Sequence, residues 1–181
     1  KYYKSKSKSK TYKPKQIHSD QLDDAVYLII VESPSKCKKI ESYLGNKYCC
    51  IASMGHIRTL NGLKSIDTKN TFEPSFDMIE EKQHHVNEMK KIISRFEHKN
   101  IYIGADDDRE GEAIGWHICE VFGLPIETTK RIIFHEVTKP ALQKAVDNPI
   151  YLNMKLIKAQ HARQVLDVIV GYKISPYLWK Y

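Results

Sequence analysis

Hydrophobic and polar positions follow two different periods along the 181-residue chain. Short, continuous β-prone apolar runs are typical of strands buried on both faces of a parallel sheet. They predict strands at residues 25–31, 47–53, 100–105 and 131–135. Apolar positions at helical spacing predict helices at residues 34–44, 84–96, 110–122 and 139–146. Because these strands and helices alternate, the pattern indicates an α/β fold with a mainly parallel sheet flanked by helices.

The two ends of the chain depart from this alternation. The first 15 residues contain seven lysines, no acidic residue and no hydrophobic period, which is typical of a disordered tail. Beyond Pro149 the pattern changes to one long helix, from Asn153 to about Tyr172. We therefore expect a basic tail over residues 1–24, an α/β domain over 25–150 and the helical start of a following domain over 151–181. The chain does not begin with methionine, so we expect the natural protein to be longer.

The net charge of +7 comes from the tail. Seven of the 29 Lys and Arg residues lie there, so the remaining 22 balance the 22 Asp and Glu residues. Acidic residues concentrate in the middle of the chain and basic residues after Lys130, which suits a metal site acting on a phosphate backbone. No apolar run approaches the ~20 residues that span a bilayer, and we expect no membrane association. The four cysteines form no Cys-x-x-Cys pattern, so we expect no zinc site.

The densest chemistry lies in the acidic segment that follows the strand at 100–105. Asp106 and Asp108 alternate and Glu110 opens the next helix. Grouped carboxylates are costly unless a cation neutralises them, and hard oxygen ligands suit Mg²⁺. An acidic helix start is the plain alternative, but it explains three consecutive aspartates poorly. A phosphoacceptor domain would need a lysine at the end of a late strand, and none is present at His135.

Two further features extend this hypothesis. Glu32 follows the first strand as the aspartates follow theirs, so it is expected to approach the same metal, with Lys36 one helical turn away. On the last helix, polar residues recur at i, i+3, i+4 and i+7, with apolar residues expected on another side. The polar residues are Gln160, Arg163, Gln164 and Asp167, and the apolar ones are Leu156, Leu166 and Ile169. This polar face either contacts nucleic acid or is a solvated face with a weak Arg163–Asp167 pair.

Several ordered segments resemble the Toprim domain of type IA DNA topoisomerases, with the bacterial topoisomerase I branch closest. They are VESPSK at 31–36, GHIR at 55–58, DDDREGEAIGWH at 106–117, FHEVT at 134–138 and the stretch 159–179. Two positions depart from the family pattern. Asp107 stands where a proline is usual, and Gln164 stands where a second arginine is common.

The resemblance implies a Toprim fold and roles for individual residues. Mg²⁺ would be held by Glu32, Asp106, Asp108 and Glu110. Glu32 would also assist proton transfer, and Lys36 would stabilise charge or donate a proton. Residues expected to contact DNA are His56, Arg58, Arg163, Gln164, Asp167, Tyr172 and Trp179.

The resemblance also implies a reaction. In the family a tyrosine attacks one DNA strand and keeps the 5′ phosphate, another strand passes through the break, and religation follows without ATP. The partner would be a single-stranded segment of negatively supercoiled DNA, and we expect an intracellular monomer. No segment matching the nucleophilic tyrosine is present, so we expect this chain to be inactive alone. The alternatives are another Toprim enzyme, primase-like or a nuclease, and a non-catalytic single-strand DNA-binding module.

Overall fold

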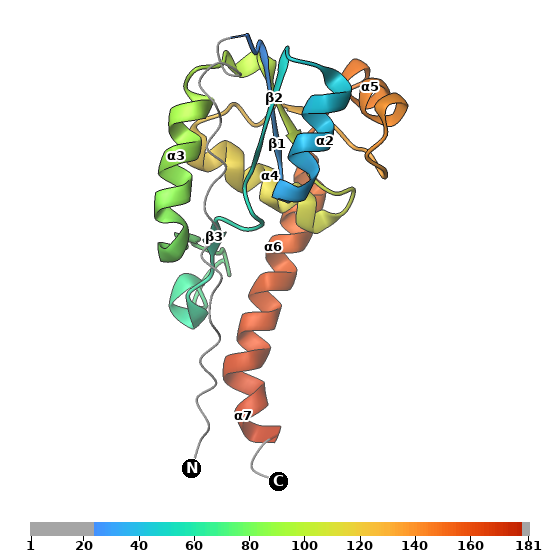
Figure 1. Ribbon diagram of the computed structural model, residues 1–181. Coiled ribbons are helices and arrows are strands. Elements are labelled where there is room, and N and C mark those ends of the chain that lie inside the picture. Colours follow the sequence, from blue (N-terminus) through green and yellow to red (C-terminus); the bar gives the residue numbers. More distant parts are fainter. Residues whose placement is uncertain (1–23, 179–181) are drawn as a thin grey trace, which may run out of the picture.

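The computed structural model describes residues 24–178, and its centre is a five-stranded sheet between two layers of helices (Figure 1). The strand order is β2-β1-β5-β6-β7, and only the last pair is antiparallel. The strands are β1 (Tyr27–Val31), β2 (Tyr48–Ala52), β5 (Ile101–Gly104), β6 (Lys130–Arg131) and β7 (Ile150–Tyr151). The predicted α/β fold with a mainly parallel sheet is confirmed.

Strand β1 shows why the sheet is buried on both faces. Its side chains alternate between two separate hydrophobic cores, with Leu28 and Ile30 in one and Ile29 and Val31 in the other. Helices α3 (Gln83–Ile93) and α4 (Arg109–Phe122) complete the first core, and α2 (Pro34–Leu44) and α5 (Lys139–Asp147) complete the second. The continuous apolar runs of the sequence therefore reflect helices on both sides of the sheet.

A small excursion separates β2 from α3. Strands β3 (Arg58–Thr59) and β4 (Asp77–Met78) form a two-stranded antiparallel sheet, with the 3₁₀ turn η1 (Gly62–Ser65) between them and η2 (Glu80–Lys82) after them. A third 3₁₀ turn, η3 (His98–Asn100), precedes β5.

The chain continues from β7 into α6 (Met154–Ile169), the π-helical segment η4 (Val170–Ile174) and α7 (Ser175–Leu178). Helix α6 packs on α4 and then runs on beyond the sheet (Figure 1). The long helix predicted from Asn153 is therefore present. Among the described helices, none combines the length and the apolar character that crossing a membrane requires.

Two expectations were wrong in detail. The strand predicted at 131–135 is reduced to the two residues of β6, and its partner β7 was not foreseen. On α6, the expected division into a polar and an apolar side fails. Gln160 is buried on the same side of α6 as Ile157 and Val165, whereas Leu166 is 60% exposed.

Candidate functional site

The acidic residues meet where the chain leaves β1 and β5. These strands are neighbours, but β1 connects to β2 on one side of the sheet and β5 connects to β6 on the other. Ligand sites of open α/β sheets form at such switch points, beyond the carboxyl ends of the strands. Glu32 directly follows β1, and its Oε1 accepts a hydrogen bond from the backbone N–H of Asp106 at 3.1 Å. The expected approach of Glu32 to the acidic segment is thus present.

The carboxyl group of Glu32 is more easily protonated than an ordinary glutamate. Partial burial raises its pKa, the Asp106 backbone N–H opposes that shift, and the negative charges of Asp106 and Asp108 add to it. A smaller opposing effect comes from the positive charge of Lys36. A carboxyl group that holds its proton more tightly is suited to proton transfer nearer neutral pH.

Lys36 lies against the same cluster. Its Nζ donates to Asp106 Oδ1 at 2.9 Å and lies 5.9 Å from the centroid of the Phe134 ring. The Lys36 side chain is 28% exposed and that of Asp106 is 59% exposed, so this ion pair is open to solvent on one side. The arrangement places an ammonium directly on one of the predicted metal ligands.

Asp108 has a second, structural task. It is the N-cap of α4, and its Oδ1 accepts the backbone N–H of Gly111 at 2.7 Å. The first turn of α4 lies so close to the acidic loop that a Cβ on Gly111 would be only 2.2 Å from the Asp106 carbonyl oxygen. Asp108 is therefore held by the helix start, with Oδ2 left for another partner.

Glu110 turns toward His56 and not toward the other acids. Its Oε1 lies 3.1 Å from His56 Nε2, so the GHIR loop and the acidic segment touch at this point. The loop itself is fixed by Lys82, whose ammonium donates to the carbonyl oxygens of Met54 and His56. Burial lowers the pKa of Lys82.

The cluster only partly fits a magnesium ion. Its oxygen-rich donor set is what Mg²⁺ prefers. However, within residues 24–178 no group of three or more carboxylate, histidine or cysteine side chains is gathered closely enough to hold a metal ion. Asp106 Oδ1 is taken by Lys36 and Asp108 Oδ1 by Gly111. Coordination therefore requires the second carboxylate oxygens or small side-chain rotations.

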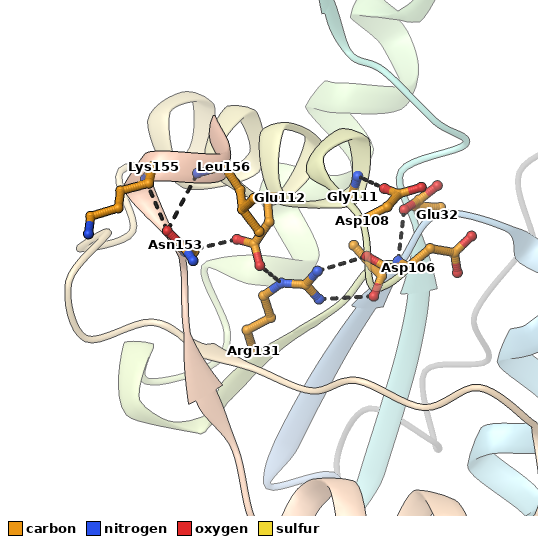
Figure 2. A network of polar contacts seen from close by, with 10 residues as sticks. Glu32, Asp106, Asp108, Gly111, Glu112, Arg131, Asn153, Lys155 and Leu156 are labelled. Atoms are coloured by element: carbon orange, nitrogen blue, oxygen red, sulfur yellow. Dashed lines mark hydrogen bonds and ion pairs between the residues drawn. The ribbon is translucent and has the colours of Figure 1, made fainter. Parts of the chain in front are cut away.

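Arg131, which was not predicted from the sequence, holds the acidic loop by its backbone carbonyl groups (Figure 2). Its side chain is fully buried, and its three donating nitrogens reach Glu112 Oε1 at 2.8 Å, the Ala105 carbonyl at 2.9 Å and the Asp106 carbonyl at 2.7 Å. Glu112 Oε2 accepts the backbone N–H of Asn153 at 2.9 Å. A basic residue inside a predicted buried strand was the available signal, since such a charge needs a buried partner.

The predicted DNA contacts fall into different surroundings. The guanidinium of Arg58 donates to the Phe76 carbonyl at 3.2 and 2.9 Å, so this group is engaged within the protein. Arg163 is well exposed, and its Nε lies 3.8 Å from Asp167 Oδ2, a loose pair. Tyr172 is 61% exposed, with its hydroxyl beside Gly62 of η1.

The two remaining residues predicted to contact DNA are Gln164 and Trp179. Gln164 is half-buried, with an Oε1 that has no hydrogen-bond partner among the described residues. Trp179 lies outside the described residues.

A buried cluster of rings joins α4, α6 and the loop before β4. His117 is fully buried, its ring centroid is 4.5 Å from that of Phe76 and 5.8 Å from that of His161, and neither ring nitrogen has a partner within the described chain. Burial lowers the pKa of His117 to about 3, and the positive charge of Arg58 adds to this. The cluster packs α6 against α4 and leaves a neutral imidazole inside.

Comparison with known proteins relates the chain to a domain family and to a topoisomerase of known structure. The Toprim domain matches residues 27–137. The structure of full-length topoisomerase I from Thermotoga maritima is similar, with a TM-score of 0.75 and 44% sequence identity over 84% of this chain. The chain spans 26% of that protein. The resemblance found in the motifs is thereby confirmed, and the chain belongs to the Toprim domain family.

Proposed function

We propose that this chain is the metal-binding part of a type IA DNA topoisomerase and that it binds Mg²⁺ and single-stranded DNA. The observation that carries the proposal is the 3.1 Å contact between the carboxylate of Glu32 and the backbone of Asp106, across the switch point of the sheet. Glu32, Asp106 and Asp108 would hold the ion, with Glu110 beside them. Bound there, Mg²⁺ supplies positive charge that orients and neutralises the phosphodiester.

The residues around the ion would divide the remaining work. Glu32, whose pKa is raised by burial, would exchange a proton with the 3′ oxygen that leaves the phosphate. The ammonium of Lys36 would move from Asp106 to a phosphate oxygen, since its side chain has solvent on one side. His56 would contact the strand near the acids, held by Lys82 through the carbonyl groups of its loop.

The second part of the proposal is a DNA-binding face on α6. Arg163 is exposed and only loosely paired, so its guanidinium is free to contact a phosphate oxygen. The exposed ring of Tyr172, nine residues further along in η4, offers a stacking surface for a base. The assignment as a topoisomerase, against a primase-like enzyme or nuclease, is supported by the extent of the Thermotoga match. It covers 84% of the chain, more than residues 27–137 alone can fill.

Metal binding is tested with Mn²⁺ and Mg²⁺ on the purified chain, by calorimetry and by the paramagnetic effect of Mn²⁺ on nearby amide signals. Asp106→Asn and Asp108→Asn are expected to weaken binding at least tenfold. Asp107→Asn is the matched control, because it removes the same charge from the neighbouring exposed position. An equal loss in Asp107→Asn would reduce the site to general attraction by the acidic segment and would refute the proposal.

Strand passage is tested separately. The chain is expected to bind a single-stranded oligonucleotide but not to relax negatively supercoiled plasmid in the presence of Mg²⁺, since no segment resembling the family's nucleophilic tyrosine is found in it. Relaxation by the purified chain would contradict this assignment of roles.

A further inference from the structure

Arg131 is placed to fix the backbone of the acidic loop and not to touch a substrate. Its guanidinium is fully buried, and each of its three nitrogens already donates a hydrogen bond within the protein. Two of the acceptors are the consecutive carbonyl oxygens of Ala105 and Asp106. The planar fork of arginine suits this arrangement, because it holds two neighbouring acceptors in one fixed orientation.

The same ion pair reaches the start of α6. Glu112 accepts Arg131 Nε with one carboxylate oxygen and the backbone N–H of Asn153 with the other. Asn153 is the N-cap of α6, where its own side chain accepts the backbone N–H groups of Lys155 and Leu156. One buried carboxylate therefore connects the first residues of α6 to the arginine that holds the acidic loop (Figure 2).

Close packing along α4 supports the same connection independently. Gly111 and Gly115 are one turn apart on α4, with Glu112 between them in the sequence. A Cβ on Gly111 would meet the Asp106 backbone at 2.2 Å, and a Cβ on Gly115 would meet the Leu152 side chain at 2.9 Å. Helix α4 thus presses on the acidic loop at one point and on the residue before the α6 cap at the next, with little room for either to shift.

We propose that Arg131 and Glu112 are positioning residues that hold the acidic loop and the first turn of α6 as one unit. The inference rests on the proposed function in two respects: the acidic loop is the metal site, and α6 carries the DNA-binding face. Through this ion pair, the carboxylates of Asp106 and Asp108 keep their orientation relative to the exposed Arg163. Neither positioning residue contacts the metal or the DNA.

The test uses Glu112→Gln in the full 181-residue chain. A glutamine presents one acceptor oxygen, so it can serve Arg131 or the Asn153 N–H but not both. The Mn²⁺ affinity of the acidic loop is expected to fall at least tenfold, as for residues that orient metal ligands from behind. Amide signals are expected to shift at both Asn153 and Ala105–Asp106. Glu120→Gln is the matched control, since Glu120 lies on the same helix but is exposed.

A loss of stability alone must be separated from positioning. Leu142→Ala leaves a cavity in the second hydrophobic core, between α5 and the sheet, on the face opposite α4. It is expected to lower the unfolding temperature without changing Mn²⁺ affinity. If Glu112→Gln does not fold, the double variant Arg131→Met with Glu112→Leu replaces the pair by apolar side chains of similar volume. It is expected to fold and still to bind Mn²⁺ at least tenfold more weakly than the unaltered chain.

The inference is overturned if a folded variant keeps both the original Mn²⁺ affinity and the original amide signals of Ala105 and Asp106. A chain that takes up no Mn²⁺ before any substitution would refute the proposed metal site instead. In that case the amide signals alone decide the inference. Joint shifts at Asn153 and at Ala105–Asp106 support it, and a shift confined to Asn153 refutes it.

Discussion

The ammonium of Lys36 lies 2.9 Å from Oδ1 of Asp106, a carboxylate predicted to hold a metal ion at the acidic loop. In the protein without DNA, the lysine therefore neutralises part of the charge that Glu32, Asp106 and Asp108 accumulate. A phosphate would draw the ammonium away and leave the aspartate to the metal. Such an exchange of partners would link the proposed DNA binding to the proposed metal binding.

Removing the ammonium should favour the metal and disfavour DNA. Lys36→Met is expected to tighten Mn²⁺ binding by up to about fivefold, because a partly exposed ion pair contributes at most about 1 kcal/mol. The same variant should bind a single-stranded oligonucleotide more weakly. Calorimetry and fluorescence anisotropy measure the two affinities. Lys39→Met, on the exposed side of the same helix, serves as control, and weaker Mn²⁺ binding in Lys36→Met would contradict the competition.

The first turn of α4 should not tolerate a side chain at Gly111. A Cβ there would lie 2.2 Å from a backbone oxygen, which cannot move aside without displacing Asp106. Gly111→Ala is expected to cost about 1–3 kcal/mol in the free energy of unfolding and to weaken Mn²⁺ binding. Gly171→Ala, where no atom lies within 4 Å of the added Cβ, should be neutral or slightly stabilising. Urea denaturation compares the two, and equal effects would refute the packing argument.

The buried ion pair should be costly to break and cheap to replace. Arg131→Ala leaves the Glu112 carboxylate buried with one partner lost, and we expect a loss of about 3–5 kcal/mol in the free energy of unfolding. Arg131→Met with Glu112→Leu should recover most of that loss. Lys130→Met, in the same strand, removes a charge lying 5.0 Å from the Tyr102 ring and should cost less than about 1 kcal/mol. A double variant as unstable as Arg131→Ala would contradict this account.

Mild acid should weaken the packing of α6 on α4 through His117. Burial lowers its pKa to about 3 in the folded chain, whereas an unfolded chain has the ordinary value near 6.5. Between these values the unfolded state binds more protons, so the free energy of unfolding falls as the pH drops below about 6.5. For one histidine the slope is at most about 1.4 kcal/mol per pH unit.

His161, whose pKa is lowered by burial, adds to this effect in the same direction. The measurement is urea denaturation at pH 6.5 and pH 5, above the range in which most carboxylates titrate. His117→Phe should reduce the difference between the two pH values. His98→Phe, at an exposed position, should leave it unchanged. An unaltered pH dependence in His117→Phe would exclude this histidine as its source.

The contribution of α6 to DNA binding should depend on salt. Arg163→Ala is expected to weaken binding of a single-stranded oligonucleotide and to reduce the slope of log affinity against log salt by about 0.7, the value for one phosphate contact. Lys158→Ala, an exposed position on another side of α6, should change the slope less. Equal changes in the two variants would indicate diffuse attraction in place of a defined contact.

The sheet and its main helices were predictable because their apolar positions follow clear periods. Strands β6 and β7 were not, since two residues are too short to show any period and β6 is defined by its neighbours. The approach of Glu32 to Asp106 was predictable for a different reason. The carboxyl ends of neighbouring parallel strands meet at one edge, and the order of strands and helices along the chain already placed both residues there.

The arrangement around Arg131 was not predictable from local patterns. Its partner Glu112 is 19 residues away on a helix of the first core, and only the folded sheet brings the two together. The inward face of α6 was misjudged because its buried residues, Ile157, Gln160 and Val165, mix apolar and polar side chains. Burial of Gln160 and exposure of Leu166 reverse what side-chain polarity indicates.

Helix α6 is held along its length and not only at its first residue. The Glu112 contact fixes Asn153, the rings of Trp116 and Phe76 lie against His161, and Tyr172 lies beside Gly62 of η1. Continuous helix from Met154 to Leu178 measures about 37 Å at roughly 1.5 Å per residue (Figure 1). The segment therefore has the proportions of a stiff rod that joins the start of α4 to η1, so a shift at either end would be carried to the other.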